Sequence, residues 1–142
     1  MSAQKFTIPG ELMALNEYTN ACRGHWAKGN KVKREQTELV AASVTAAKLK
    51  PYDGPVEIGV KWVEGTRKRR QLRDVDNIAF GAKFILDALV ECGVIPDDNP
   101  RIVRNVYHHY RYNADDPHVE VVVMDYDPSG RKVHYTPITG LD

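Results

Sequence analysis

No apolar run in this 142-residue chain approaches the roughly 20 residues that a transmembrane helix needs. The first ten residues, MSAQKFTIPG, lack the apolar segment of a secretory signal. Only two cysteines occur, Cys22 and Cys92, and they are not at the close spacing of a zinc site. These absences argue against a membrane protein, a disulfide-stabilised secreted domain and a structural zinc centre. We expect a cytoplasmic protein with two reduced thiols.

Charge is nearly balanced in total but not along the chain. The formal net charge is +1; the first 73 residues hold 14 Lys/Arg and 7 Asp/Glu, and the remaining residues hold 6 and 12. Because the local field attracts nucleic acid, the nearly neutral total does not exclude a DNA-binding protein. Acidic metal ligands inside a basic rim would produce such a division, and so would chance.

The length fits one domain, with no internal repeat, and we expect a flexible tail from about residue 126. Hydrophobic periodicity predicts four strands and two helices. The strands cover Lys5–Ile8, Val56–Val63, Arg101–Tyr112 and His118–Asp125, and the helices cover Lys31–Leu49 and Asn77–Cys92. The last two strands are expected to form an antiparallel hairpin across a five-residue turn. The order β-α-β-α-β-β predicts an α+β fold, a small mixed sheet with helices packed on it.

Residues 12–30 have the composition of a polar, irregular loop in which aromatic and basic residues alternate. Such residues can stack on bases and contact phosphates, so Asn16 and Lys28 are candidate DNA contacts. The alternative is a surface loop in which Trp26 or Tyr18 packs against the core. The sequence leaves both interpretations open.

A cationic loop, Glu64–Arg73, follows the strand Val56–Val63. A run of charges is usually a solvated surface. Here it directly precedes an acidic pair, which favours a loop that contacts phosphates with salt-dependent, sequence-independent affinity. Its five candidate DNA-binding cations are Arg67, Lys68, Arg69, Arg70 and Arg73.

Two acidic pairs flank the helix predicted over Asn77–Cys92. If Asp74 and Asp76 lie on an extended chain, both side chains point to one face, because side chains alternate with a period of two. Asp97 and Asp98 follow the helix, and if the chain folds back, one of them completes a site of the carboxylate oxygens that Mg²⁺ prefers. Bound Mg²⁺ would activate water and stabilise the leaving oxygen of a phosphodiester.

The same residues also have purely structural explanations. Asp76 is a plausible N-cap of the following helix, and residues 97–100, DDNP, are typical of a turn. Lys83 and Asp87 are at the i,i+4 spacing of a helical ion pair worth a few tenths of a kcal/mol. The residues alone leave the metal site and these structural roles as open alternatives.

Several short motifs follow one another in a specific order between Arg70 and Val103. They are Asp74-Val75-Asp76-Asn77, then Lys83, then Asp87-Ala88-Leu89, then Gly93 and Asp97-Asp98. This combination resembles that of the RusA-type Holliday junction resolvases, a family often carried by phages and prophages. Outside this segment the resemblance is weaker.

The resemblance implies a homodimeric, Mg²⁺-dependent endonuclease that places paired nicks in four-way DNA junctions during recombination and repair. Mn²⁺ would substitute for Mg²⁺, and no small-molecule cofactor is implied. By this resemblance Asp74, Asp76 and Asp98 are catalytic metal ligands, Asp97 is a supporting ligand and Lys83 is the catalytic lysine. Two-fold symmetry suits a reaction on two opposed strands. The alternative is a dimeric branched-DNA-binding protein that is non-catalytic or broadly selective.

Lys83 departs from the commonest family pattern. It lies seven residues after Asp76 instead of four, although its four-residue distance to Asp87 is the usual one. On a continuous helix Lys83 would share a face with Asp76 but move by roughly 4.5 Å along the axis. If the helix instead begins at Gly81 and the extra residues loop out, the usual position is restored. The sequence does not decide between the two.

Overall fold

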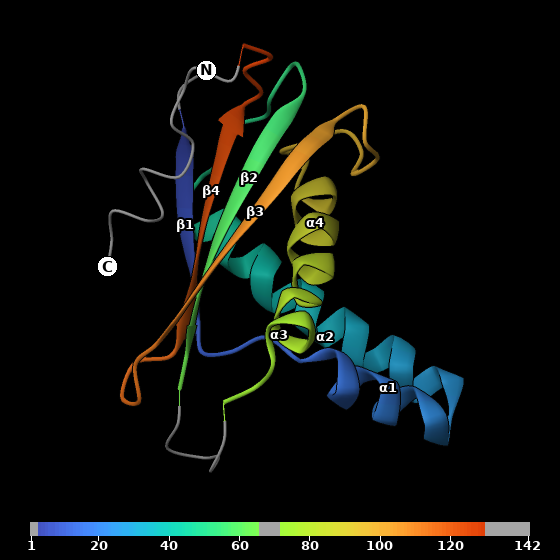
Figure 1. The fold of residues 1–142 in the computed structure, drawn as a ribbon. Helices are drawn as coiled ribbons and strands as arrows, with labels where there is room; N and C mark the ends of the chain where they lie inside the picture. The colour runs from blue at the N-terminus through green and yellow to red at the C-terminus, as the bar shows by residue number, and fades with distance from the viewer. Residues whose placement is uncertain (1–2, 66–71, 130–142) are drawn as a thin grey trace.

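A computed structural model describes residues 3–65 and 72–129 of the chain. Four strands form one sheet in the order β1-β4-β2-β3, with the helices on one of its faces (Figure 1). The elements are β1 Gln4–Pro9, α1 Leu15–Gly24, α2 Trp26–Ala46, β2 Val56–Glu64, α3 Val75–Ala79, α4 Ala82–Glu91, β3 Val103–Tyr112 and β4 His118–Asp125. The predicted α+β fold with a small mixed sheet is confirmed. Among the described residues, none of the helices combines the length and the apolar character needed to cross a bilayer.

Strand β2 is the structural centre of the sheet. Its apolar row of Val56, Ile58, Val60 and Trp62 is fully buried in the core between the sheet and the helices. The opposite row is buried too, although the alternation of apolar and polar residues in the sequence is typical of a strand with one buried face. A central strand has a neighbouring strand on each side, and side chains of these neighbours can bond its polar groups. Glu57, for example, accepts hydrogen bonds from two side chains of β3 at 2.7 and 3.2 Å. Such partners make the burial of a carboxylate tolerable.

The predicted hairpin between the last two strands is wrong. Both strands exist close to the predicted bounds, but β2 lies between them, parallel to β3 and antiparallel to β4. A parallel pair needs a crossover connection, and α3 and α4 supply it between β2 and β3. The most completely buried strand thus has a hydrogen-bonded neighbour on each side.

Residues 12–30 are not the predicted irregular loop. They include α1 and the first turn of α2, which continues into the helix predicted from Lys31. The side chain of Glu17 accepts a hydrogen bond from the backbone N–H of Ala14 at 3.1 Å, and His25 caps the start of α2. None of the residues of α1 is buried, and the apolar residues at helical spacing, Leu15, Tyr18 and Cys22, form only a short row among polar ones. Residues 15–30, named the α1–α2 arm below, project away from the sheet (Figure 1).

The two aromatic residues of the arm have different environments. Tyr18 packs on Phe80 and Phe84, with ring centroids 5.3 and 6.2 Å apart, so for this residue the core-packing alternative is confirmed. Trp26 is exposed and stacks on His25 at a centroid distance of 5.9 Å. Of these two aromatic residues, Tyr18 packs against the rest of the fold and Trp26 does not.

The helix predicted over Asn77–Cys92 is two helices, with the break at Phe80 and Gly81. A Cβ atom on Gly81 would lie 3.0 Å from Cη2 of Trp62, closer than side chains normally pack. Glycine therefore lets the chain pass against the indole of β2 at the point where it changes direction. Lys83 therefore lies on a helix whose N-cap is Gly81, as one alternative expected, but Ile78 and Ala79 belong to α3 and do not loop out.

Candidate active site

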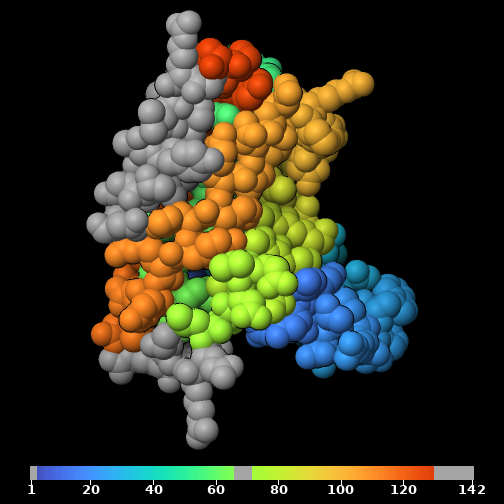
Figure 2. Space-filling model, viewed as in Figure 1, coloured from blue at the N-terminus to red at the C-terminus, as the bar shows by residue number. Residues whose placement is uncertain are grey.

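Asp74 and Asp76 lie at the start of α3, both exposed. Asp74, and not Asp76 as predicted, is the N-cap residue, and Asp76 belongs to the first helical turn. The two residues are therefore not on the extended segment that the prediction assumed. Figure 2 shows the start of α3 on the molecular surface, between residues of β3 and of α1. The acidic pair is thus accessible to a large ligand.

The α1–α2 arm places a predicted DNA contact beside this pair. The backbone N–H of Asn16 donates a hydrogen bond to Oδ1 of Asn77, 3.3 Å away, and Asn77 directly follows Asp76. The other predicted contact on the arm, Lys28, is exposed in the first turn of α2. Residues 60 positions apart along the chain therefore share one surface.

Strand β3 contributes a site residue that the sequence reasoning missed, Tyr110. Its hydroxyl donates a hydrogen bond to the backbone carbonyl of Val75 at 3.4 Å, between the two aspartates. Burial and the charge of Asp76 raise the pKa of Tyr110. The sequence signal was the alternation of Tyr110 and Tyr112 at the end of the strand, which puts both on one face.

Four of the five cations predicted to contact DNA, Arg67, Lys68, Arg69 and Arg70, lie outside the described residues. The fifth, Arg73, forms a two-pronged ion pair with Glu64, with N–O distances of 2.6 and 2.8 Å. It also donates to the carbonyl of Leu12 at 2.9 Å and to Glu17 at 3.2 Å. Arg73 therefore fastens the end of β2 to the α1 region, and its guanidinium is not presented to solvent.

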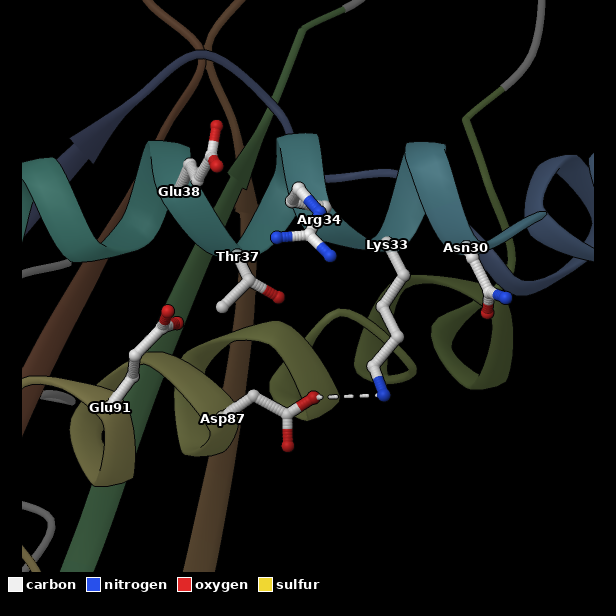
Figure 3. A pocket seen from close by; sticks show the side chains of 7 residues that line it. All are labelled: Asn30, Lys33, Arg34, Thr37, Glu38, Asp87 and Glu91. Atoms are coloured by element: carbon white, nitrogen blue, oxygen red, sulfur yellow. Dashed lines mark ion pairs between the residues drawn. The ribbon is translucent and has the colours of Figure 1, made fainter. Parts of the chain in front are cut away.

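Lys83 and Asp87 form the predicted i,i+4 ion pair on α4, with 3.9 Å between Nζ and Oδ2. Lys33 of α2 reaches the same oxygen, also at 3.9 Å. Asp87 lines a polar hollow of about 390 Å³ between α2 and α4, into which Lys33 also points (Figure 3). The contact of Lys33 with Asp87 joins α2 to α4, whereas Lys83 and Asp87 are both on α4 and pair within that helix.

Asp97 and Asp98 lie at the opposite end of the sheet from the first acidic pair. Their loop is hydrogen-bonded to the beginning of β2, since the N–H of Val56 donates to the carbonyl of Ile102 at 2.7 Å. The first pair lies instead near Glu64, the last residue of β2, which binds Arg73. The nine residues of β2 separate these ends by on the order of 25 Å.

Within one protomer the chain therefore does not fold back to bring Asp98 to Asp74 and Asp76, and that expectation is wrong. The helix α4 carries the chain away from α3 toward the other end of the sheet (Figure 1). Across the described residues, no group of three or more His, Cys, Asp or Glu side chains is placed to hold a metal ion. A single protomer does not fit the ligand set that the resemblance implies.

The two residues of the second pair differ in environment. Asp97 accepts hydrogen bonds from the N–H of Asp98 at 2.7 Å and from the amide of Asn99 at 2.9 Å. These hydrogen bonds lower the pKa of Asp97. Asp97 thus stabilises the turn, as the structural alternative predicted, and both aspartates are exposed.

His108 lies next to Tyr110 on the same face of β3 and remains exposed to solvent. Its Nδ1 accepts a hydrogen bond from Nε1 of Trp62 at 3.0 Å, and partial burial against the indole lowers the pKa of the imidazole. The imidazole of the unfolded chain keeps the ordinary histidine pKa of about 6.5. Between that value and the lower pKa of the folded state, the unfolded chain binds more protons than the folded chain. His108 therefore makes stability fall as the pH decreases through that value.

We expect the free energy of unfolding to be less sensitive to acid in His108→Gln than in the wild type. Glutamine can still accept from Trp62 but does not titrate between about pH 7.5 and about pH 5.5. Urea titrations followed by tryptophan fluorescence at both pH values measure the difference. His118→Gln is the matched control: burial lowers the pKa of His118, but bonds to Asp116 and Glu120 raise it overall. His118→Gln should therefore lose more stability than the wild type when the pH decreases. Equal changes in the free energy of unfolding in the wild type and in His108→Gln would contradict the lowered pKa of His108.

No protein-family model matches this chain, and no curated protein sequence matches it significantly. Its function has to be inferred from the arrangement of these residues.

Proposed function

We propose that the protein is a Mg²⁺-dependent endonuclease that cuts four-way or similarly branched DNA as a homodimer. The observation that supports this most is the exposed pair Asp74 and Asp76 at the start of α3, with Asn77 and Asn16 beside it. Carboxylate and amide oxygens are ligands of Mg²⁺. The Asp-x-Asp-Asn motif that carries them resembles that of the RusA-type resolvases. When bound, Mg²⁺ would activate water and neutralise the phosphate.

A homodimer is part of the proposal because one protomer does not supply all the predicted ligands. Asp98 is about the length of β2 away from Asp74 and Asp76. A two-fold axis that brings the end of α4 in one protomer to the start of α3 in its partner would unite the three acids. It would do so twice, so that two equivalent sites face two opposed strands.

The other proposed roles belong to groups that contact the DNA backbone. The α1–α2 arm, whose residue Asn16 contacts Asn77, carries the exposed cations Arg23 and Lys28, and the exposed Lys31 follows it on α2. Such cations add salt-dependent affinity without sequence preference. Lys83, partly exposed at the start of α4, would stabilise charge on the phosphate or orient the attacking water.

Cleavage of a synthetic four-way junction, a flap and a linear duplex, each with and without Mg²⁺, tests the proposal. We expect paired nicks in the junction with Mg²⁺, none without it, and little cutting of the duplex. Equal cutting of all three substrates would contradict junction selectivity.

The alternative is a dimeric protein that binds branched DNA without cutting it. The separation of Asp98 from Asp74 and Asp76 within a protomer favours this alternative, because the acids of one chain do not form a metal site. Tight binding of the junction with no cutting in Mg²⁺ or Mn²⁺ would support it over the endonuclease.

A further inference from the structure

A small hollow lies directly beside the acidic pair, and the proposed function does not account for it. Its volume is about 200 Å³. One wall is formed by the start of α3 and the residues before it, and the other by the end of β3. The principal wall residues are Leu72, Val75 and Ile78 on one side and Tyr110, Arg111 and Tyr112 on the other.

The exposed apolar surface of the described residues gathers at this hollow. Five large hydrophobic side chains are well exposed among the described residues, and three of them, Leu72, Val75 and Tyr112, line the hollow with exposed fractions of 48%, 55% and 64%. The other two, Leu15 and Trp26, belong to the α1–α2 arm. Exposed apolar groups that are rimmed by charged residues mark a binding site more often than chance exposure.

The walls of the hollow are held in place by the fold. The hydroxyl of Tyr110 donates to the carbonyl of Val75 at 3.4 Å and so joins the two sides. Arg73 and Glu64, which also line the hollow, are bound to each other at 2.6 Å. An occupant would therefore meet a preformed site with aromatic and aliphatic sides and the cationic side chain of Arg111 at its rim.

We propose that this hollow receives one unstacked nucleobase next to the phosphodiester that is cut, an inference that rests on the proposed function. Its volume is below the roughly 300–1,000 Å³ of sites for drug-sized ligands, which suits a single planar ring system. Tyrosine rings stack on any base, because every base has a π-face. Val75 lies between Asp74 and Asp76, so the base would sit within one residue of the proposed cleavage site. Extruding a base costs least where its stacking is already disturbed, as at the crossover of a branched DNA.

A double-mutant cycle between protein and DNA tests the inference. Tyr112→Ala removes the exposed ring and Tyr112→Phe retains it. Binding of each full-length variant is measured on four-way junctions in which nucleotides around the cut are replaced one at a time by an abasic nucleotide. We expect Tyr112→Ala to bind the intact junction about tenfold more weakly and Tyr112→Phe to bind like the wild type. The tenfold penalty should vanish when one particular base is absent.

Trp26→Ala is the matched control, since it removes another exposed aromatic ring from a different surface. Its effect should not depend on which base is absent. A Tyr112→Ala penalty that is the same on every abasic junction would overturn the inference. So would conversion of the Tyr112→Ala dimer to a monomer in sedimentation, because the hollow would then belong to the interface between two copies. A wild-type protein that does not bind junctions would overturn the proposed function itself, whereas binding without this coupling overturns the inference alone.

Discussion

Arg73→Ala is expected to lower the free energy of unfolding by about 3–5 kcal/mol, because it removes one partner of a buried ion pair. The side chains of Arg73 and Glu64 are only 10% and 3% exposed, and their N–O distances are 2.6 and 2.8 Å. The substitution leaves a carboxylate at the end of β2 without its two-pronged partner in a place that water barely reaches. It also frees the carbonyl of Leu12, to which Arg73 donates at 2.9 Å. Since small domains are stable by about 5–15 kcal/mol, the loss is a large fraction of the total.

Urea denaturation of a short series of variants measures this effect. Arg73→Lys keeps the charge but cannot form two parallel hydrogen bonds, so it should fall between the wild type and Arg73→Ala. The double variant Arg73→Met with Glu64→Met should recover most of the loss, because it leaves no buried charge. The exposed pair Lys31–Glu35, at 3.9 Å, is the control, and Lys31→Ala should cost less than about 1 kcal/mol. If Arg73→Ala is equally mild, the ion pair does not have the proposed structural role.

The strands were predictable because apolar residues recur in the sequence with a period of two, as in Val56, Ile58, Val60 and Trp62. The lateral order of the strands was not, since nothing local to β3 and β4 shows that β2 will lie between them. The helix α1 was missed because its apolar row is short and stands among polar residues. Prediction therefore succeeded where an element shows a long apolar periodicity and failed where position depends on partners distant in sequence.

For the candidate site, too, some residues could be predicted from the sequence and others could not. The spacing of Asp74 and Asp76 marked them as candidates, but the contact of Tyr110 with Val75 depends on the path of β3 past α3. A run of five cations gave no sign that Arg73 pairs with a buried carboxylate. The separation of Asp98 was more accessible to prediction, because a helix of some 16 residues carries the chain roughly 24 Å. Charge patterns identify candidates, and the direction of the intervening helix decides which of them can meet.

Two inactive variants, Asp76→Asn and Asp98→Asn, are expected to restore cutting when they are combined in one dimer. Alone, each should lose on the order of a thousandfold in the rate of junction cleavage, because each neutralises one proposed ligand of every site, while junction binding is retained. In the mixed dimer one protomer carries Asp76→Asn and its partner carries Asp98→Asn. If each site takes Asp76 from one protomer and Asp98 from the other, one site contains both substitutions and the other site contains neither. The mixed dimer should therefore place a single nick in each junction where the wild type places two.

Mixed dimers are obtained by co-expression with two different tags and purification through both, and their products are compared on a junction labelled on each strand. The matched control combines Asp76→Asn with Asp74→Asn. Asp74 and Asp76 both lie at the start of α3 and would serve the same site. Each of the two sites of that mixed dimer therefore carries one substitution, and neither site should cut. A site built within one protomer predicts that the Asp76→Asn and Asp98→Asn mixture is as inactive as this control. Restored cutting in the first mixture alone would show that the acids at opposite ends of β2 act together only between two copies of the chain.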